Sequence, residues 1–149
     1  TRTNKTPVVA LVARDGAARA KAIKSASAAT LISTVQQHVE PSVLLMTDEW
    51  PAYRGLDHFY DGRETVKHSA GEYVRGNVHT NTVESFFALL KRGIVGSYHH
   101  VSRKHLSRYC DEFAFRWSHR GISDAERTMT ALQQTTGKRL PYKTVIGVN

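Results

Sequence analysis

The chain has a single cysteine, Cys110, among its 149 residues. One cysteine excludes an internal disulfide and a zinc site built from cysteines, and it suits a reducing compartment. No hydrophobic run approaches the roughly 20 residues that cross a membrane, and residues 1–7 lack the apolar stretch of a signal peptide. We therefore expect a cytoplasmic protein without a membrane-embedded part. Cys110 lies in an apolar helical pattern, which predicts that it is buried.

Acidic residues are also few. Thirteen Asp and Glu stand against 21 Lys and Arg, for a net charge of +8. Such an excess favours a polyanionic partner, because bound Lys and Arg release condensed counterions from a phosphate backbone. The basic residues gather between positions 91 and 120, where only Asp111 and Glu112 are acidic. We predict a DNA-binding surface whose main residues are Lys91, Arg92, Arg103, Lys104 and Arg108.

Several familiar catalytic motifs do not occur in the sequence. We find no glycine-rich phosphate loop, nucleophile elbow or dinucleotide fingerprint. His99, His100 and His105 lie close in sequence, but adjacent loop histidines point in different directions and no cysteine accompanies them. Contact with DNA is therefore a better interpretation of this run than structural zinc. Asp15 stands in an Asp-Gly pair, so a hairpin turn is favoured over a catalytic role.

The hydrophobic pattern predicts one mixed α/β domain, with a core at about 7–120 and a C-terminal helix and basic tail at about 121–149. Residues 7–13 and 19–24 would form a hairpin, and Ser27 would cap a helix that stops before Pro41. The remaining expected elements are a buried strand at 43–48, a turn at 50–53, a short strand at 64–68, a loop at 69–77 and helices near 82–92, 103–118 and 124–135.

An apolar stripe at helical spacing marks the predicted helix at 103–118. This stripe is interpreted as core packing rather than a cofactor site. Its residues are Leu106, Tyr109, Cys110, Phe113 and Trp117.

Two acids carry most of the functional information. Asp48 ends the predicted strand at 43–48, and Glu84 lies in the first turn of the helix near 82–92. Helical spacing places Asn81, Glu84, Ala88 and Lys91 on one face. A strand-end acid, a helix-borne acid and a lysine suit metal-dependent phosphoryl transfer.

Each of these residues also has an ordinary structural explanation. Asp48 could be a turn residue at the end of a strand. Asn81 could cap the helix with Glu84 at its third position, as a variant capping box. Lys91 could be a solvated surface charge. We favour the catalytic interpretation because all three residues fit one pattern.

Longer stretches of the chain resemble bacterial insertion-sequence transposases of the DDE superfamily. The similarity covers most of the chain in order, and the block from 68 to 117 is its most specific part. The stretches that carry it are 5–10 (KTPVVA), 47–53 (TDEWPAY), 68–75 (HSAGEYVR), 79–93 (HTNTVESFFALLKRG), 98–105 (YHHVSRKH) and 111–117 (DEFAFRW).

This resemblance implies a ribonuclease H-like core, similar to that of retroviral integrases. Such a core would hold two Mg²⁺ or Mn²⁺ ions and would cut and rejoin DNA at the ends of a mobile element. Asp48 would be the second catalytic acid and Glu84 the third, both as metal ligands. Asn81 and Lys91 would support the site or contact DNA. The implied partners are element ends, target DNA and further copies of the transposase, at the nucleoid.

The chain departs from the family pattern at its beginning. In these transposases the first acid lies on a strand upstream of the segment that matches residues 5–7. Two metal ions normally need a shared carboxylate, so two acids should bind them poorly. The absent strand would be central and would leave its neighbours unpaired. We therefore expect an inactive part of a transposase that lacks the first strand of the catalytic domain. It could be a truncated gene product, a product of a decayed element or an excised part.

Three other functions remain open at this point. The first is a non-catalytic DNA-binding remnant of a transposase. The second is a related nuclease that does not join DNA ends. The third is an orphan scaffold whose positive charge serves solubility alone.

Overall fold

The computed structural model describes residues 5–139. Its first unit is an antiparallel hairpin of β1 (Val8–Val12) and β2 (Ala18–Ala22), with Val8 opposite Ala22. The turn between them contains Asp15 and is closed by a hydrogen bond from Ala13 N to Ala17 O of 2.9 Å. The expected hairpin is confirmed, and Asp15 is a turn residue.

The second unit joins a helix to a parallel strand pair. Helix α1 (Ala28–Gln36) begins after Ser27, whose side chain accepts a hydrogen bond from Thr30 N, as expected for its cap. Strand β3 (Leu44–Asp48) pairs in parallel with β4 (Gly62–Val66). The two strands are connected through the 3₁₀ helix η1 (Pro51–His58), which packs against α1.

The segment between 50 and 80 is more regular than its sequence suggests. The turn expected at 50–53 is the start of η1, since Pro51 stands at its first position. The expected strand at 64–68 ends at Val66, and His68–Ala70 forms the short 3₁₀ helix η2. The expected loop contains β5 (Val74–Arg75), which pairs with β6 (Val78–His79). These two-residue strands lack a hydrophobic alternation that could predict them.

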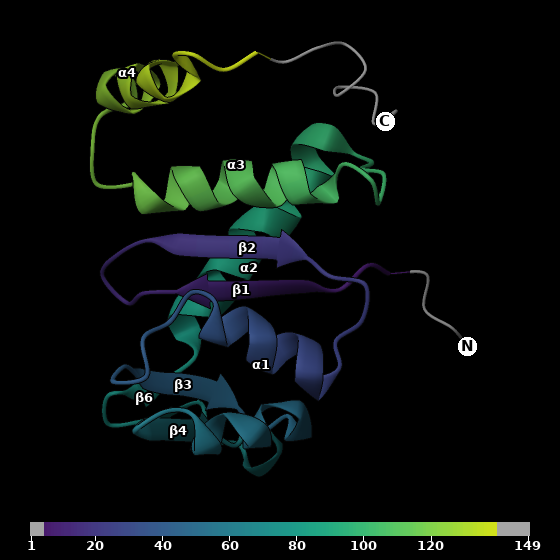
Figure 1. The fold of residues 1–149 in the computed structure, drawn as a ribbon, viewed down its shortest axis with the longest axis vertical. Coiled ribbons are helices and arrows are strands. Elements are labelled where there is room, and N and C mark those ends of the chain that lie inside the picture. The colour runs from purple at the N-terminus through teal and green to yellow at the C-terminus, as the bar shows by residue number, and fades with distance from the viewer. Residues whose placement is uncertain (1–4, 140–149) are drawn as a thin grey trace.

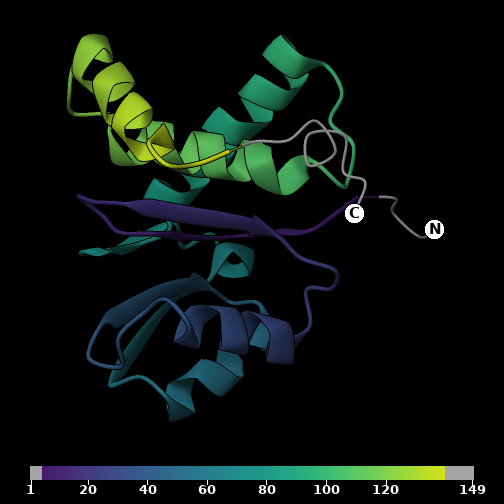
Figure 2. The same cartoon turned by 45° about the horizontal axis from the view of Figure 1, so that its top comes forward.

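Three α-helices complete the described chain. Helix α2 (Asn81–Gly93) runs into the π-helical turn η3 (Ile94–Tyr98), followed by α3 (Leu106–Ser118) and α4 (Asp124–Thr135). Helix α3 packs along β2, while α2 contacts β1 and α3 (Figures 1 and 2). None of the helices in the described part reaches the length and apolar character of a membrane span.

The main core lies between the hairpin and helices α2 and α3. Phe86 and Cys110 are fully buried, and Phe113 is nearly so. Removing a large apolar side chain such as Phe86 from water stabilises the fold by about 1.5–3 kcal/mol. The stripe predicted on the third helix is confirmed as core packing, because Cys110 and Phe113 belong to this cluster and Leu106 and Trp117 pack against it.

The strands form three separate two-stranded sheets within residues 5–139. Strand β1 pairs with β2, and β3 pairs with β4, but β1 and β3 are not hydrogen-bonded to each other. Figure 1 shows the β1–β2 pair above the β3–β4 pair, with α1 drawn between β1 and β3. The architecture is thus mixed α/β, with a strand edge of each pair left open. A ribonuclease H-like fold stays a prediction.

Candidate functional site

Asp48 is the last residue of β3, as the sequence predicts. Its neighbour in the parallel pair is Val66, the last residue of β4. The half-buried Asp48 carboxylate accepts a hydrogen bond from Trp50 N at 3.0 Å through Oδ1. This hydrogen bond stabilises the turn that leads into η1, so Asp48 does act as a turn residue. The Asp48 charge also adds to burial, the larger cause, in raising the pKa of Tyr53.

Glu84 lies in the first turn of α2 and has a structured surrounding. Thr80 Oγ1 donates a hydrogen bond of 2.5 Å to Glu84 Oε1. His68 Nε2 lies 3.2 Å from Thr80 Oγ1 and 3.6 Å from Glu84 Oε1. Thr80 is buried, whereas the Glu84 side chain is 54% exposed. The Glu84 carboxylate is therefore hydrogen-bonded to a buried residue and still accessible to solvent.

The variant capping box considered as an alternative role for Asn81 and Glu84 does not form. Helix α2 begins at Asn81, which places Thr80 at the cap, and no side-chain cap bond forms there. The Thr80 hydroxyl instead binds the Glu84 carboxylate. A capping box requires the third helical residue to reach back to the cap backbone, and here Glu84 is bonded to a side chain. The ordinary explanation of Glu84 as a cap is thereby removed.

One short segment connects the surroundings of the two acids. Glu49, next to Asp48, accepts hydrogen bonds from Ser69 N at 2.9 Å and Ser69 Oγ at 2.7 Å. These side-chain and backbone bonds lower the pKa of Glu49. Ser69 follows His68, which lies against Glu84. Strand β6, just before α2, also packs beside β4 and β3. Glu49 and Glu84 thus contact neighbouring residues of one segment, and Asp48 is next to Glu49 in sequence.

Glu49, His68 and Thr80 are site residues that the sequence reasoning missed. His68 follows β4, the strand parallel to β3, so it emerges at the same sheet edge as Asp48. That edge is where α/β folds place ligands, and this signal could have identified His68. The role of Thr80 depends on where α2 begins, which the sequence did not resolve.

The other predicted site residues lie on the exposed side of α2. Asn81, Glu84, Ala88 and Lys91 are all exposed. Phe86 and Leu90 on the other side are buried. The amide, carboxylate and ammonium therefore share a solvent-facing surface, as their spacing predicts.

The predicted DNA-binding residues all reach the surface. Lys91 and Arg92 stand in the last turn of α2, Arg103 and Lys104 precede α3, and Arg108 lies in its first turn; all five are exposed. Two further basic residues of this region, Arg116 and Arg120, have contacts within α3 and the residues just after it. Arg116 pairs with Glu112 at 2.7 Å, and the Arg120 guanidinium lies 4.8 Å from the Trp117 ring centre.

A metal site would draw on carboxylate oxygens, the ligands that Mg²⁺ prefers. Asp48 and Glu84 are of the right type and accessible. However, no group of three His, Cys, Asp or Glu in the described part of the chain is arranged to hold a metal ion. The donor type fits a magnesium site, while the number of donors falls short of a two-ion centre. His99, His100 and His105 likewise form no such group.

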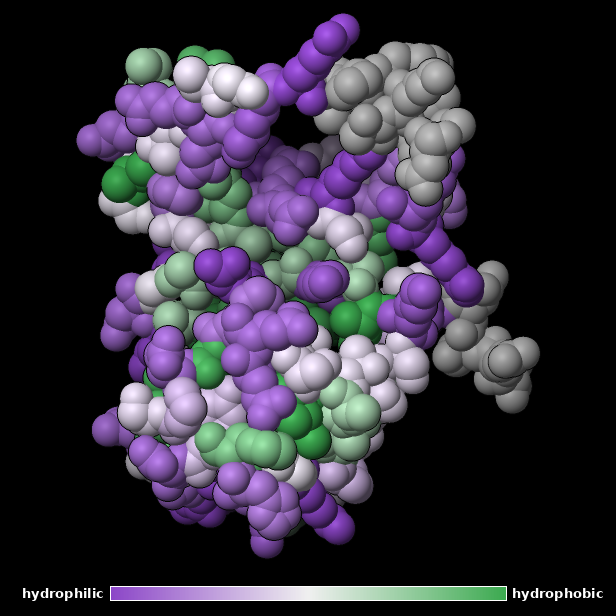
Figure 3. Space-filling view, viewed as in Figure 1, coloured by the Kyte–Doolittle hydropathy of each residue, from purple (hydrophilic) through white to green (hydrophobic). Residues whose placement is uncertain are grey.

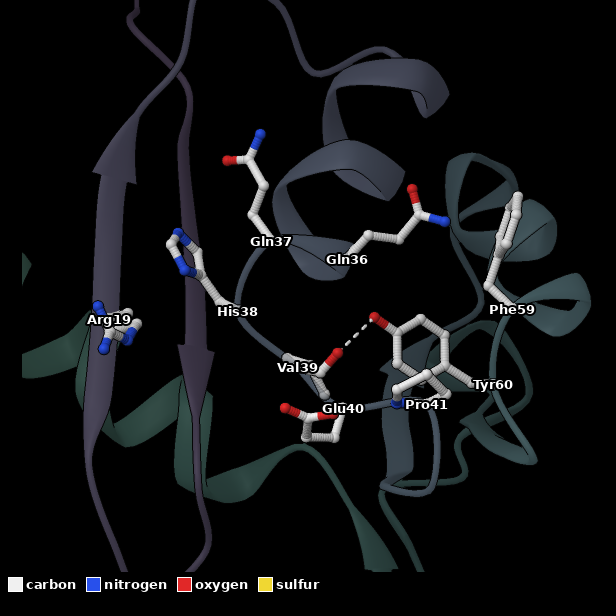
Figure 4. A pocket seen from close by; sticks show the side chains of 9 residues that line it. All are labelled: Arg19, Gln36, Gln37, His38, Val39, Glu40, Pro41, Phe59 and Tyr60. Atoms are coloured by element: carbon white, nitrogen blue, oxygen red, sulfur yellow. Dashed lines mark hydrogen bonds between the residues drawn. The ribbon is translucent and has the colours of Figure 1, made fainter.

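A hollow of about 470 Å³ lies near the other end of β3. Figure 4 shows its lining side chains, which come from β2, the end of α1 and residues 59–60. Tyr60 donates a hydrogen bond to Val39 O across one side. Arg19 and Glu40 give it opposite charges. Pro41 precedes β3, so this hollow is separate from the Asp48 end of the strand.

Comparison with known proteins identifies the family. A model of the ISXO2-like transposase domain matches residues 1–118. The chain belongs to this family. It is also 36% identical over 119 residues to an uncharacterized protein in transposable element ISH50 of Halobacterium salinarum. That alignment covers 76% of this chain and 39% of the relative, so the chain spans about two fifths of the relative's length. No solved structure matches.

The transposase family assignment agrees with the resemblance found in the sequence. Membership of the DDE superfamily and a bacterial origin stay predictions. The family match ends at Ser118, the last residue of α3, so α4 lies outside it.

Proposed function

We propose that this transposase-family chain is the larger part of a DDE-type catalytic domain with a ribonuclease H-like fold. One observation carries the proposal: the end of β3, with Asp48 and Glu49, and the start of α2, with Glu84, meet at the His68–Ser69 segment. A strand-end acid and a helix-borne acid, with 35 residues between them in sequence, are thus brought to one region.

In this proposal Asp48 and Glu84 are metal ligands. A bound Mg²⁺ or Mn²⁺ would activate water or a 3′-hydroxyl and stabilise the leaving oxygen during DNA cleavage and strand transfer. Thr80 and His68 orient the Glu84 carboxylate through the hydrogen bond and close contact described above. Asn81 and Lys91, exposed on the same side of α2, contact the DNA backbone beside the acids.

The open strand edges support the proposed fold. In the ribonuclease H-like arrangement, the strand with the first acid is central, with neighbours on both sides. Here β1 and β3 each have one partner among the described residues and are not paired with each other. One additional strand between them would join both pairs into a single sheet and satisfy their unpaired backbone groups. It would also bring the third carboxylate that the metal site lacks.

The test is a cleavage assay with labelled duplex DNA and Mg²⁺ or Mn²⁺. We expect no metal-dependent cleavage or joining from residues 1–149 alone. Where the reading frame continues upstream, the extended chain should cleave element ends, and Glu84→Gln should abolish this. Glu40→Gln, an exposed acid before Pro41, is the matched control and should remain active. Cleavage by residues 1–149 that Glu84→Gln abolishes would contradict the proposed deficiency.

A non-catalytic DNA-binding remnant is the second candidate. The shortage of metal ligands among residues 5–139 favours it. It predicts salt-sensitive DNA binding that Glu84→Gln leaves unchanged, and an extended chain that never cleaves DNA. In either case we propose that the partner is DNA in the cytoplasm at the nucleoid, and that the intact transposase acts as a homo-oligomer on paired ends.

A further inference from the structure

A second hollow, of about 410 Å³, lies where the hairpin meets the start of α3. It is formed by three segments that are far apart in sequence: the residues before β1, those after β2 and those before α3. A hydrogen bond of 2.9 Å from Ile23 N to Pro7 O holds the first two together. Packing of α3 along β2 brings the third beside them.

The lining of this hollow is strongly basic. Four cationic side chains come from the three segments, and two hydroxyl residues stand among them; no acidic residue lines it in the described part. The lining residues that carry the argument are Lys5, Thr6, Lys24, Arg103, Lys104 and Ser107. Convergence of four cations raises the local potential for an anion. The positive surroundings also reach His105, whose pKa is lowered by burial and then by Arg108 and Lys104.

The hollow and Asp48 both lie at the carboxyl ends of their strands. The arrowheads of β2 and β3 point the same way in Figure 1, and β3 ends at Asp48 while β2 leads into the hollow at Ala22–Lys24. In the space-filling view, hydrophilic side chains project at mid-height on the right, while more apolar residues cover much of the lower right (Figure 3). A path along the carboxyl ends of β2 and β3 would therefore connect the hollow with Asp48.

We infer that this hollow, lined by Lys5, Lys24, Arg103 and Lys104, binds the phosphodiester backbone of DNA beyond the catalytic acids. Two features favour phosphate over a carboxylate ligand. The lining combines several lysines with hydroxyl groups, which hold phosphate oxygens without a fixed bidentate geometry. The four cations of the lining are also exposed, which suits a strand passing across the hollow. The inference rests on the proposed function, because it takes DNA as the partner.

The experiment compares salt dependence of duplex binding for two charge-matched variants. The first, called the hollow variant, is Lys5→Gln/Lys24→Gln, which removes two cations from the hollow. The second, called the control variant, is Lys21→Gln/Arg54→Gln, which removes two exposed cations that do not line the hollow. Affinity for a labelled 20-base-pair duplex is measured by fluorescence anisotropy across a salt series. Each phosphate contact contributes about 0.9 to the slope of log K against log salt.

We expect the hollow variant to lose about 2 from the magnitude of that slope, and roughly 60-fold in affinity near 0.1 M salt. The control variant should keep the slope of the unmodified chain. Equal slopes for the two variants would overturn the inference and leave DNA binding itself intact. Absence of duplex binding by the unmodified chain would overturn both this inference and the proposed function. Circular dichroism melting of each variant separates loss of fold from loss of contact.

A second arm tests a small-anion alternative. Tripolyphosphate, titrated against the unmodified chain and the hollow variant, should bind weakly and only at low salt. Tight binding of tripolyphosphate that displaces the duplex and is lost in the hollow variant would assign the hollow to a free phosphate ligand. That result would overturn the backbone contact.

Discussion

Replacing Gly93 with alanine should destabilise the protein, although alanine is the better helix former. Gly93 ends α2 with helical dihedral angles, φ −63° and ψ −46°, so the backbone accepts any L-residue. In the interior of a helix, alanine is favoured over glycine by about 1 kcal/mol. A loss of stability at this position therefore has to come from packing.

The packing clash at this position is severe. A Cβ atom on Gly93 would lie 2.0 Å from Cζ of Phe113 and 2.8 Å from both Cε atoms. Phe113 is 5% exposed and belongs to the main core, so its ring has little room to move. Overpacking of this kind costs about 1–3 kcal/mol. At the upper end of that range the clash costs about 3 kcal/mol, and the better helix propensity of alanine offsets about 1 kcal/mol of this. We therefore expect the free energy of unfolding to fall by about 2 kcal/mol.

Thermal unfolding followed by circular dichroism measures this effect. For a chain of this size, about 2 kcal/mol lowers Tm by roughly 4–8 °C. Gly96→Ala is the matched control, because a Cβ there meets nothing within 4 Å. It should leave Tm unchanged or slightly raised. If Gly93→Ala is as stable as Gly96→Ala, the close approach of α2 and α3 described here is wrong. Phe113→Leu should relieve part of the clash in a double-mutant cycle.

Three further predictions concern a site residue, the buried thiol and the last helix. Thr80→Val should lower the free energy of unfolding in urea by about 1–2 kcal/mol, because the hydrogen bond to Glu84 is lost. Thr80→Ser keeps the hydroxyl and should lower it less; equal losses would contradict the role of the hydroxyl. Burial raises the pKa of Cys110 to about 11 from 9.0, so the folded state favours the neutral thiol. The contribution of the buried thiol to the free energy of unfolding should be complete below pH 9 and should decline as the pH rises toward 11. Rapid reaction of the native Cys110 thiol with a disulfide reagent at about pH 8 would refute its burial. Ser123→Ala removes the capping box with Glu126 and should lower hydrogen-exchange protection of α4 by about 1 kcal/mol. Thr130→Ala, two turns further along the helix, should leave the cap intact.

The candidate site contains residues that sequence reasoning found and residues that it missed. Asp48 and Glu84 were predicted because their positions follow from local patterns: an apolar run that ends in an acid and a helical period that begins near one. Glu49, His68 and Thr80 were missed, since their roles arise from side-chain contacts between residues 4 to 20 positions apart. The false capping box at Asn81 came from a helix start misplaced by one residue, the least certain part of such an assignment.

Local chemistry in the sequence determined the hairpin at Asp15-Gly16, the cap at Ser27 and the buried stripe of α3 around Cys110, and the structure agrees with each. These features need only neighbours in the chain, so periodicity and turn chemistry specify them. Tertiary structure alone decided that β1 and β3 stay unpaired with each other, that His68 lies against Glu84, and that Lys5 and Lys24 join Arg103. Those arrangements depend on how distant segments pack, and no spacing within a single segment contains that information.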